Sequence, residues 1–330
     1  MVGLGQRMDL VIVTPVLNDW ESCRILLGNI DRLALPDGCR LSVLIVDDGS
    51  ARTGDATLVS ELGGGSIAAV DVVQLACNVG HQRAIALGIS TAVTRKPGAF
   101  VLVMDCDGED NPAEIPRLIQ AIEGQTAAAV VAERARRSEG AKFRAGYAAY
   151  QALFRMLVGK RIDFGNFCLL GPDAAYRLAH MADTWNHLAA TLLRARIRLI
   201  SVPTDRTTRY AGQSSMNMPS LVAHGLSAFA VFSDHVFARL LLLASLIGVG
   251  VATIGIVVLC MRLFTDLATP GWASTVLGAS AILFVQAILI CLVAAVQMLA
   301  TRSQPGAQPI ALLPQFVRTI HTLLPRPDAA

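Results

Sequence analysis

The sequence predicts an α/β domain built on a Rossmann-like, mostly parallel sheet, followed by a transmembrane hairpin of two helices. Two observations support this fold class: short apolar runs alternate with amphipathic stretches over the first 132 residues, and two long uncharged runs lie near the C-terminus. Strands that alternate with helices are typical of a parallel sheet covered on both faces. At 330 residues the chain also has enough apolar material for one large or two modest domains.

Five apolar runs are expected to form the strands of this sheet: residues 10–14, 41–47, 70–75, 100–104 and 127–132. The amphipathic stretches between them predict helices over residues 20–33, 81–94 and 112–123. Ligands of such sheets bind beyond the carboxyl ends of the strands. Polar segments follow each of the first four runs, namely "TPVLND", "DDGS", "CNVGHQ" and "DCDGED". We therefore expect these four segments to meet at one edge of the sheet.

The remaining elements lead from this domain to the membrane. We expect helices over residues 143–162 and 172–181, a strand over 197–202, a polar loop over 206–218 and a short amphipathic piece over 310–324. The domain organisation that follows is an α/β domain over residues 1–218, a juxtamembrane interfacial helix over 219–239, the transmembrane hairpin over 240–301 and a cytosolic tail over 302–330.

The hairpin explains the unusual composition of the chain. A mean hydropathy of +0.52 with 16% charged residues is too apolar for an ordinary soluble enzyme. Residues 240–261 and 273–300 contain no charged residue, and each run is long enough to cross a bilayer core of ~30 Å as a helix. A buried helix of a soluble domain is the alternative, and the length of the runs disfavours it.

The charge distribution predicts the side of the membrane on which the domain lies. The apolar run "LVIV" is too short for a signal peptide, so we expect the N-terminal domain to stay in the cytosol. The tail carries Arg318 and Arg326, whereas Arg262 in the connecting loop is balanced by Asp266. The Ala- and Arg-rich composition suggests a bacterial chain, so the expected location is the bacterial inner (cytoplasmic) membrane, with two helices and a cytosolic domain.

Cysteine spacing and net charge argue against some kinds of metal site and binding partner. The seven cysteines include no C-x-x-C pair, which argues against a disulfide framework or a zinc site. A net charge of +3 gives no reason to expect a nucleic-acid partner. Residues 133–161 nevertheless hold eight Lys or Arg against two Glu, which form either a solvated helix face or a surface for phosphates and anionic lipid heads. Small residues in the first span would also permit a homo-oligomer.

The stretch "VLVMDCDGEDNP" carries the main chemical signal. It places Asp105, Asp107, Glu109 and Asp110 within six positions, where the carboxylates raise one another's pKa unless a cation lies between them. Asp105 and Asp107 are the expected ligands of Mg²⁺ or Mn²⁺, because such an ion takes one or two carboxylates and keeps waters and phosphate oxygens. The alternative is a solvated acidic loop before a helix that starts at Asn111.

A second acidic turn follows the second predicted strand. Asp47 and Asp48 precede Gly49 and Ser50, and such a turn could hold the base and ribose of a nucleoside. The alternative is an Asx turn that caps the next helix.

Taken in order, "VIVTPVLND", "IVDDGS", "NVGHQRAIALGI", "MDCDGEDNPAEIP" and "RYAGQSSMNM" resemble glycosyltransferase family 2, which has the GT-A fold. Within it the chain resembles the membrane-anchored branch that includes the dolichol-phosphate mannose synthases and the bactoprenol glucosyltransferases, over residues 8–235. The resemblance implies that residues 209–216 close over the donor phosphates. It also implies a nucleotide-sugar site of Pro15, Asp47, Asp48, Asn78, Gly80, Gly212 and Ser214, and catalytic roles for Asp105, Asp107, Asp110 and Arg209, with the metal on Asp105 and Asp107.

The predicted activity is that of an inverting, metal-dependent glycosyltransferase that uses a nucleotide-sugar donor and a membrane acceptor, with a polyprenyl phosphate favoured. A cation and Arg209 would stabilise the charge that develops on the leaving diphosphate. A phosphate acceptor is already anionic at neutral pH and needs no strong base. A hydroxyl acceptor is the alternative and would need one, with Asp110, Glu109 or His187 as candidates.

The chain also departs from the branch that it resembles. Asn166 and Cys168 stand where polyprenyl-phosphate enzymes usually carry an acid and a base, Ser215 replaces a usual Lys, and Cys77 replaces a usual Arg. These differences concern the acceptor side and leave the donor side largely intact. A third hypothesis is a nucleotide-sugar-binding membrane protein without catalytic activity, which the retained Asp48, Asp105 and Asp107 disfavour.

Overall fold

A computed structural model of the chain describes residues 8–134, 141–205, 207–211, 218–265, 271–303 and 306–325. The chain separates into two compact units. The first consists of residues 1–146, 162–231 and 306–330, and it contains the sheet. The second consists of residues 147–161 and 232–305, and it contains two long apolar helices.

The first unit is built on one mixed, mostly parallel sheet, which confirms the predicted architecture. In the described part of the chain its eight strands run in the order β7-β5-β6-β4-β1-β2-β3-β8. Strand β6 is antiparallel to β4 and β5, and β8 is antiparallel to β3, while the other neighbours are parallel. The strands are β1 (Met8–Val16), β2 (Cys39–Asp47), β3 (Ile67–Leu75), β4 (Phe100–Val103), β5 (Ala128–Arg134), β6 (Phe164–Leu170), β7 (Arg198–Thr204) and β8 (Val317–Leu324).

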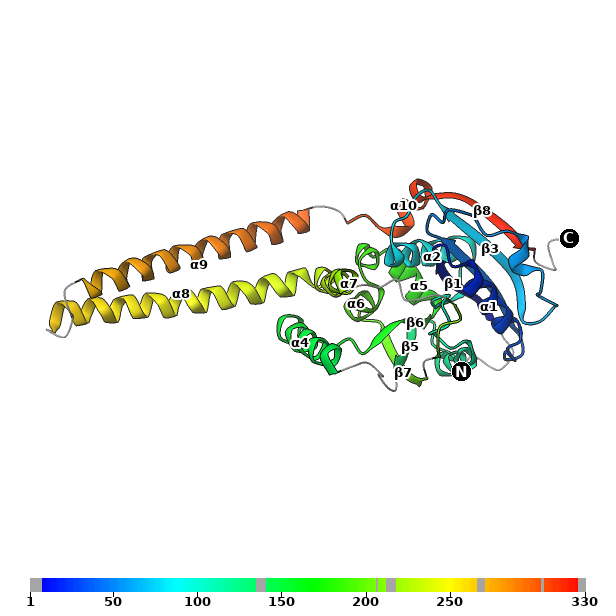
Figure 1. The fold of residues 1–330 in the computed structure, drawn as a ribbon, viewed down its shortest axis with the longest axis horizontal. Coiled ribbons are helices and arrows are strands. Elements are labelled where there is room, and N and C mark those ends of the chain that lie inside the picture. Colours follow the sequence, from blue (N-terminus) through cyan, green and yellow to red (C-terminus); the bar gives the residue numbers. More distant parts are fainter. Residues whose placement is uncertain are drawn as a thin grey trace. The chain divides into compact units, whose positions relative to one another are not determined.

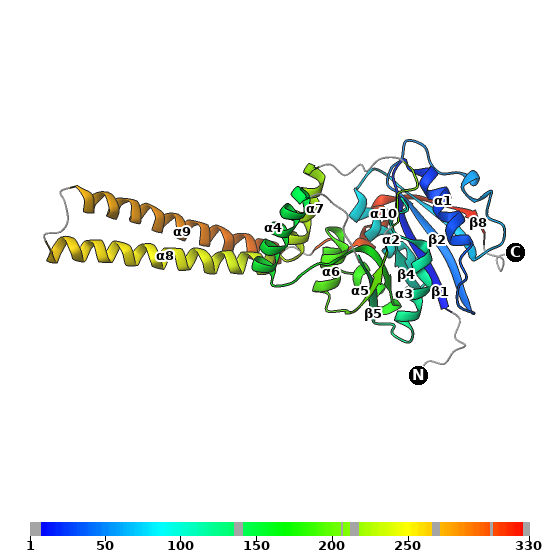
Figure 2. The ribbon, with the colours of Figure 1, turned by 60° about the horizontal axis from the view of Figure 1, so that its bottom comes forward.

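Helices cover both faces of this sheet, as its apolar strands require. Leu10 and Ile12 of β1 pack into one hydrophobic core with α1 (Trp20–Asp31) and α3 (Ile115–Ile122). Val11 and Val13 point to the other face because side chains alternate along a strand. That second core contains α2 (His81–Arg95), α5 (Pro172–Ala179), α6 (Leu188–Arg194) and α10 (Pro309–Phe316). Figures 1 and 2 show α1 and α2 on opposite faces of the strands.

Three short 3₁₀ helices lie in the connections of this unit: η1 (Ala56–Val59), η2 (Pro112–Glu114) and η3 (Ala182–Trp185). Two further helices, α4 (Ala141–Val158) and α7 (Met218–Val231), connect the sheet to the second unit along the chain. Two helices share the range 219–239, for which one interfacial helix was predicted, since α7 ends at Val231 and α8 begins at Ser233. Asp234 lies in the first turn of α8, where unpaired backbone N–H groups stabilise a carboxylate.

The second unit is dominated by α8 (Ser233–Phe264) and α9 (Trp272–Ser303), which lie side by side (Figures 1 and 2). Both helices are long and apolar enough to cross a membrane, and only 17% and 6% of their most apolar windows are buried. A core helix of a soluble domain would be mostly buried. Small residues let the two helices approach, because a Cβ at Gly248 would lie 3.6 Å from the Cβ of Ala287.

The tail after α9 forms α10 and then β8, so the predicted single amphipathic piece over residues 310–324 was only partly right. Strand β8 adds to the free edge of β3, and its β-branched residues suit an extended conformation. The ring of Phe316 packs 5.3 Å from that of Trp185, which anchors the tail on the second core. The chain therefore leaves the sheet domain before α8 and returns to the same domain after α9.

Candidate active site

The turn after β2 is tied to the loop after β3 by one buried carboxylate. Asp48 is only 3% exposed, and its carboxylate accepts hydrogen bonds from the backbone N–H groups of Val79 at 2.7 Å and Gly80 at 3.0 Å. Burial raises the pKa of Asp48, and these two hydrogen bonds oppose the rise. Gly49 has a φ of +79°, and a Cβ there would lie 2.8 Å from the backbone nitrogen of Asn78. Only glycine allows the two loops to approach this closely.

Asp47 forms the turn and also leaves an acceptor for a ligand. Its side chain is fully buried, and Oδ1 accepts a hydrogen bond from the Ser50 N–H at 2.8 Å. This is the Asx turn of the alternative interpretation, but it caps no helix, because Asp55 is the N-cap of η1. Its Oδ2 atom is buried and has no hydrogen-bond partner within the described ranges. Pro15, also assigned to the nucleotide, is buried in β1 beside Val46 of β2. The structure thus brings Pro15, Asp47, Asp48 and the loop around Gly80 to one edge of the sheet.

The loop after β4 is folded by its own carboxylates. Asp110 Oδ2 accepts a hydrogen bond from the N–H of Asp105 at 2.9 Å, and Asp107 Oδ1 accepts one from the N–H of Glu109 at 2.9 Å. Gly108 adopts a φ of +90° between them. The side chains of Asp105 and Asp107 remain 33% and 15% exposed, so both carboxylates still border solvent.

Arg209 lies at this acidic loop. Its guanidinium approaches Asp107 Oδ2 with NH2 at 3.0 Å, and its side chain is 25% exposed. The Nε atom of Arg209 is buried and makes no hydrogen bond to any residue that the structure describes. A buried donor without a partner commonly marks a place where a ligand or water binds. Two other predicted site residues, Gly212 and Ser214, lie outside the described residues.

His81, the first residue of α2, connects the loop after β3 to the acidic loop after β4. Its Nε2 atom lies 3.3 Å from Asp105 Oδ1 and 3.0 Å from the side-chain nitrogen of Asn166. Burial lowers the pKa of His81, but the carboxylates of Asp105, Asp107 and Asp110 prevail and raise it above its ordinary value. All four loops that the sequence predicts to converge therefore meet here.

Asn166, which contacts His81, belongs to a series of hydrogen-bonded amide groups. The backbone N–H of Leu188 donates to Gln82 Oε1 at 2.8 Å, and the Gln82 amide nitrogen donates to Asn166 Oδ1 at 3.0 Å. Asn166, noted in the sequence only as a departure from the family, is thus part of a network that joins α2, β6 and the start of α6. His187 has a different role, since it is 7% exposed and its Nδ1 accepts the Ala190 N–H as the N-cap of α6.

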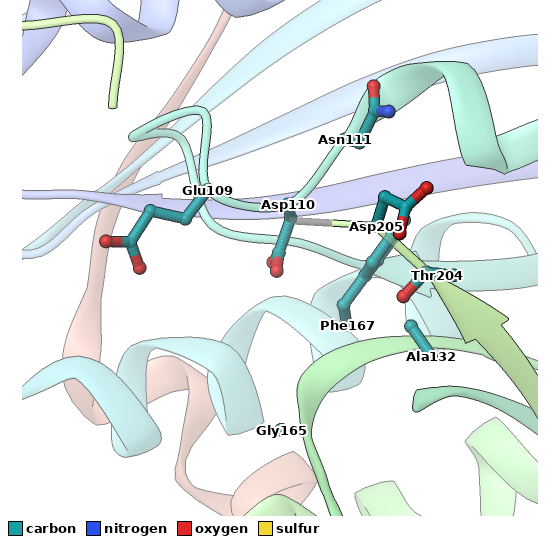
Figure 3. A pocket seen from close by; sticks show the side chains of 8 residues that line it. All are labelled: Glu109, Asp110, Asn111, Ala132, Gly165, Phe167, Thr204 and Asp205. Atoms are coloured by element: carbon teal, nitrogen blue, oxygen red, sulfur yellow. The ribbon is translucent and has the colours of Figure 1, made fainter. Parts of the chain in front are cut away.

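A shallow hollow opens beside the acidic loop (Figure 3). It contains about 320 Å³ of empty space, including the part that is open to solvent. Figure 3 shows that the Glu109 side chain extends away from Asp205, while Asp110 lies between the two. The hollow is lined by Glu109, Asp110, Asn111, Ala132, Gly165, Phe167, Thr204 and Asp205.

The donor set fits a divalent ion that is shared with a ligand. Within the described ranges no three His, Cys, Asp or Glu side chains are arranged to enclose a metal ion. Asp105 and Asp107 offer hard oxygen ligands, and Mg²⁺ commonly takes one or two carboxylates and fills its other positions with water and phosphate oxygens. The residues present therefore fit an ion that is held partly by the substrate.

Two contacts at the site could not be predicted from the sequence patterns. Asn29 lies on α1 and donates a hydrogen bond to the hydroxyl of Tyr210, while Thr207 donates to a backbone oxygen of the acidic loop. Tyr210 stands next to Arg209 in the sequence, which is the only signal for it. Asn29 has none, because a polar residue on an amphipathic helix usually faces solvent.

Comparison with known protein families identifies the family to which the chain belongs. The family model described as glycosyl transferase family 2 matches residues 11–183, slightly more than half of the chain. The chain belongs to glycosyltransferase family 2. The predicted family, GT-A fold class and enzyme class are thereby confirmed. The matched range contains the acidic loop and the loops after β2 and β3.

Three solved structures with similar folds are distant from this chain in sequence. Glucosyl-3-phosphoglycerate synthase from Mycobacterium tuberculosis, in complex with Mn²⁺, UDP and glucosyl-3-phosphoglycerate, has a TM-score of 0.48 at 15% identity and covers 69% of this chain and 80% of that chain. Mannosyl-3-phosphoglycerate synthase from Rubrobacter xylanophilus has a TM-score of 0.48 at 15% identity, with coverages of 80% and 78%. A mannosyltransferase from Pyrobaculum calidifontis, in complex with GDP-Man and Mn²⁺, has a TM-score of 0.40 at 17% identity, with coverages of 94% and 80%.

Proposed function

We propose that this family 2 glycosyltransferase is metal-dependent and inverting, and that it transfers a sugar from a nucleoside diphosphate sugar to a polyprenyl phosphate in a membrane. Its catalytic group is Asp105, Asp107, Asp110 and Arg209. The nucleotide-sugar site is formed by Pro15, Asp47, Asp48, Asn78 and Gly80, together with Gly212 and Ser214. The inverting outcome comes from the family resemblance.

One observation carries this proposal, the pairing of Arg209 with Asp107 at the carboxyl edge of the sheet. The guanidinium is held at 3.0 Å from a carboxylate that is itself fixed by the acidic loop, and its buried Nε is still available. A diphosphate placed here would receive charge-assisted hydrogen bonds from Arg209. These bonds strengthen as the diphosphate leaves with additional negative charge, so they stabilise the transition state more than the ground state.

The neighbouring turn is suited to the nucleoside. The buried Oδ2 of Asp47 would accept a hydrogen bond from a base N–H or a ribose hydroxyl, either of which would relieve the cost of an unpartnered buried acceptor. Asp48 holds the turn and the Asn78–Gly80 region together, so it orders both walls of the site.

Asp105 and Asp107 would hold the Mg²⁺ or Mn²⁺ ion. When bound, this ion neutralises the diphosphate as a Lewis acid. His81 lies against Asp105 and fixes the orientation of that carboxylate, while Asp110 fixes the Asp105 backbone. The chain thus supplies a preorganised set of oxygens whose geometry needs little change on binding.

A phosphate acceptor would need no general base from the protein. Its second pKa is about 6, so it attacks as an anion at neutral pH without a strong base. His187, the histidine considered for that task, is buried in the cap of α6. The long helices α8 and α9 would anchor the enzyme in a bacterial inner membrane with its catalytic domain in the cytosol, where a lipid-linked acceptor is within reach.

The carboxylates that line the hollow favour a second candidate, transfer to a hydroxyl. Glu109, Asp110 and Asp205 would repel an anionic acceptor there, whereas any of them could accept the proton of a hydroxyl group. Asn166, which contacts His81, is one of the residues that depart from the polyprenyl-phosphate enzymes on the acceptor side.

Two measurements test these proposals. Thermal shifts of the detergent-purified full chain with UDP or GDP should be larger with Mn²⁺ than with EDTA, because the ion joins protein to diphosphate. Equal shifts with and without the ion would contradict metal dependence. A radiolabelled nucleotide sugar incubated with extracted membranes should give a lipid product that mild acid cleaves, and an acid-stable product would favour the hydroxyl acceptor instead.

A further inference from the structure

Residues 207–210 lie across the acidic loop and follow its backbone. The N–H of Tyr210 donates to the carbonyl of Asp107 at 2.8 Å, and the N–H of Thr207 donates to the carbonyl of Glu109 at 3.3 Å. The Thr207 hydroxyl also donates to the carbonyl of Gly108. The two segments are therefore joined at three successive residues of the acidic loop.

The ring of Tyr210 rests directly on Gly108. A Cβ at Gly108 would lie 2.7 Å from Cγ of the tyrosine ring, closer than real Cβ atoms approach, and the φ of +90° there is itself unfavourable for other residues. Position 108 thus requires glycine for two reasons. The turn between Asp107 and Glu109 needs a positive φ, and the Tyr210 ring occupies the space of a Cβ.

The hydroxyl of Tyr210 reaches a third element. It accepts a hydrogen bond from the side-chain nitrogen of Asn29 on α1 at 3.0 Å, and the ring packs against the core that α1 and α3 share. Burial raises the pKa of Tyr210, so the phenol stays protonated at neutral pH. Tyr210 therefore connects the rigid body of the domain to the acidic loop.

We infer that Tyr210 and Asn29 are positioning residues that dock Arg209 for the donor diphosphate. Arg209 precedes Tyr210 directly, so a fixed Tyr210 backbone holds the guanidinium at Asp107 before any ligand binds. A guanidinium that is already in place avoids the ordering cost that a free arginine side chain would impose on binding. This inference rests on the proposed function, in which Arg209 binds the diphosphate.

The test compares five variants of the full chain in detergent micelles: Tyr210→Phe, Asn29→Ala, the double variant Tyr210→Phe/Asn29→Ala, Tyr210→Ala and the control Tyr176→Ala, whose parent side chain is 59% exposed. The affinity for UDP and GDP with Mn²⁺, KM for the donor and kcat are measured for each. Loss of one hydrogen bond should weaken nucleotide affinity about 2- to 12-fold in Tyr210→Phe and in Asn29→Ala. The double variant Tyr210→Phe/Asn29→Ala should be no weaker than either single one, because both remove the same bond.

Tyr210→Ala should lose more than tenfold in affinity and in kcat/KM, since it removes the ring that seats the segment on Gly108. Tyr176→Ala should change neither value. Additive losses in the double variant, or a Tyr210→Ala affinity within twofold of the parent, would overturn the inference. The melting temperature of each apo variant separates a local effect from a general loss of folding, because a positioning role predicts an affinity loss in protein that still melts cooperatively.

Hydrogen exchange provides a readout that needs no donor. The N–H of Tyr210 should exchange slowly in the parent chain and at least tenfold faster in Tyr210→Ala, while the N–H groups of β1 keep their protection. Unchanged exchange would overturn the docking itself. Faster exchange in a chain whose parent binds neither UDP nor GDP would instead contradict the donor assignment, and with it the role given to Arg209.

Discussion

Asp107 is the residue at which the contacts of the site meet. Its Oδ1 shapes the acidic loop through Glu109, its Oδ2 pairs with Arg209, and its carbonyl accepts the N–H of Tyr210. Asp107 therefore fixes the acidic loop, pairs with the Arg209 guanidinium and binds the backbone of the segment that contains Arg209. A change at Asp107 should affect function far more than it affects folding, since most of these contacts lie at the edge of the domain.

Asp107→Asn should reduce sugar transfer by at least about 100-fold, because an amide keeps the size of the side chain but loses the charge that attracts a divalent ion and Arg209. Transfer from a radiolabelled nucleotide sugar measures the loss, and insertion into membranes should persist. The control is Asp37→Asn, which alters an exposed carboxylate in the loop before β2 and should leave transfer unchanged. Unchanged turnover in Asp107→Asn would rule out its assigned role.

The cysteines offer a chemical test of the nucleotide loop. Burial raises the pKa of Cys23 to about 12 and also raises the pKa of Cys106 and Cys168, so few of these thiols ionise at pH 8. Cys77 is exposed and lies next to Asn78 in the loop that Asp48 supports. The thiolate is the form that reacts with alkylating reagents, so Cys77 should be modified well before the three buried cysteines.

Mass spectrometry of the full chain treated with N-ethylmaleimide at pH 8 should therefore find the label on Cys77 before it appears on Cys23, Cys106 or Cys168. Addition of a nucleoside diphosphate with Mn²⁺ should slow this labelling severalfold, because the ligand would cover the loop. The labelling of Cys77 in the presence of adenosine serves as the control for a nucleoside without the diphosphate. A Cys77 rate that no nucleoside diphosphate changes would place the donor elsewhere.

At the scale of elements, the C-terminal tail belongs to the catalytic domain. Strand β8 pairs with β3, the Thr319 hydroxyl donates to the Gln74 side chain at 3.1 Å, and the Thr322 hydroxyl donates to Asp71 at 2.6 Å. Without β8, the edge of β3 would expose a row of unpaired N–H and C=O groups, which promote aggregation. The strand thus completes a sheet whose seven other described strands all precede the long helices in the sequence.

Truncation after residue 305, which removes α10 and β8, should lower the melting temperature of the chain in detergent by several degrees and promote aggregation. Loss of the packing between Phe316 and Trp185 adds to the loss of the strand. Removal of residues 326–330 alone leaves β8 intact and is the matched control, for which we expect no change. Static light scattering during the melt follows aggregation directly, and equal melting of the two truncated chains would contradict this role of the tail.

At the scale of the whole molecule, chain connectivity constrains the topology of the long helices. Helix α7 and strand β8 both belong to the sheet domain, and α8 and α9 lie between them in the sequence. If α8 and α9 cross a membrane, both ends of this pair must lie on the side where the domain lies. The pairing of β8 with β3 supports this conclusion independently of the charge bias that suggested it.

Reporter fusions test this topology. Green fluorescent protein fused to either terminus should fluoresce in a bacterial host, because the proposed topology would put both termini in the cytosol. Alkaline phosphatase inserted within the 265–271 connection should be active, since the same topology would put that connection in the periplasm. Alkaline phosphatase at the C-terminus serves as the negative control, and its activity there would contradict both the proposed topology and the placement of β8.

Most of the fold could be predicted from the sequence because apolar periodicity determines which residues are buried. The strands that precede the polar loops were expected within about three residues of their observed starts, and the acidic loop was recognised from its carboxylates alone. The tail was harder to predict, since "VRTIHTLL" is too short to distinguish a strand from an amphipathic helix without a partner. Its strand forms because β3 offers an unpaired edge.

The sequence by itself determined the family, the apolar helices and the positions of the polar loops that follow the strands, because each follows from residues close together in the chain. The tertiary structure alone decided which distant residues serve those loops: Asn29 reaches Tyr210 across 181 positions, and Asn166 reaches His81 across 85. Such pairs leave no local pattern, since a hydrogen bond depends on a separation of about 3 Å that only the packed sheet and helices impose.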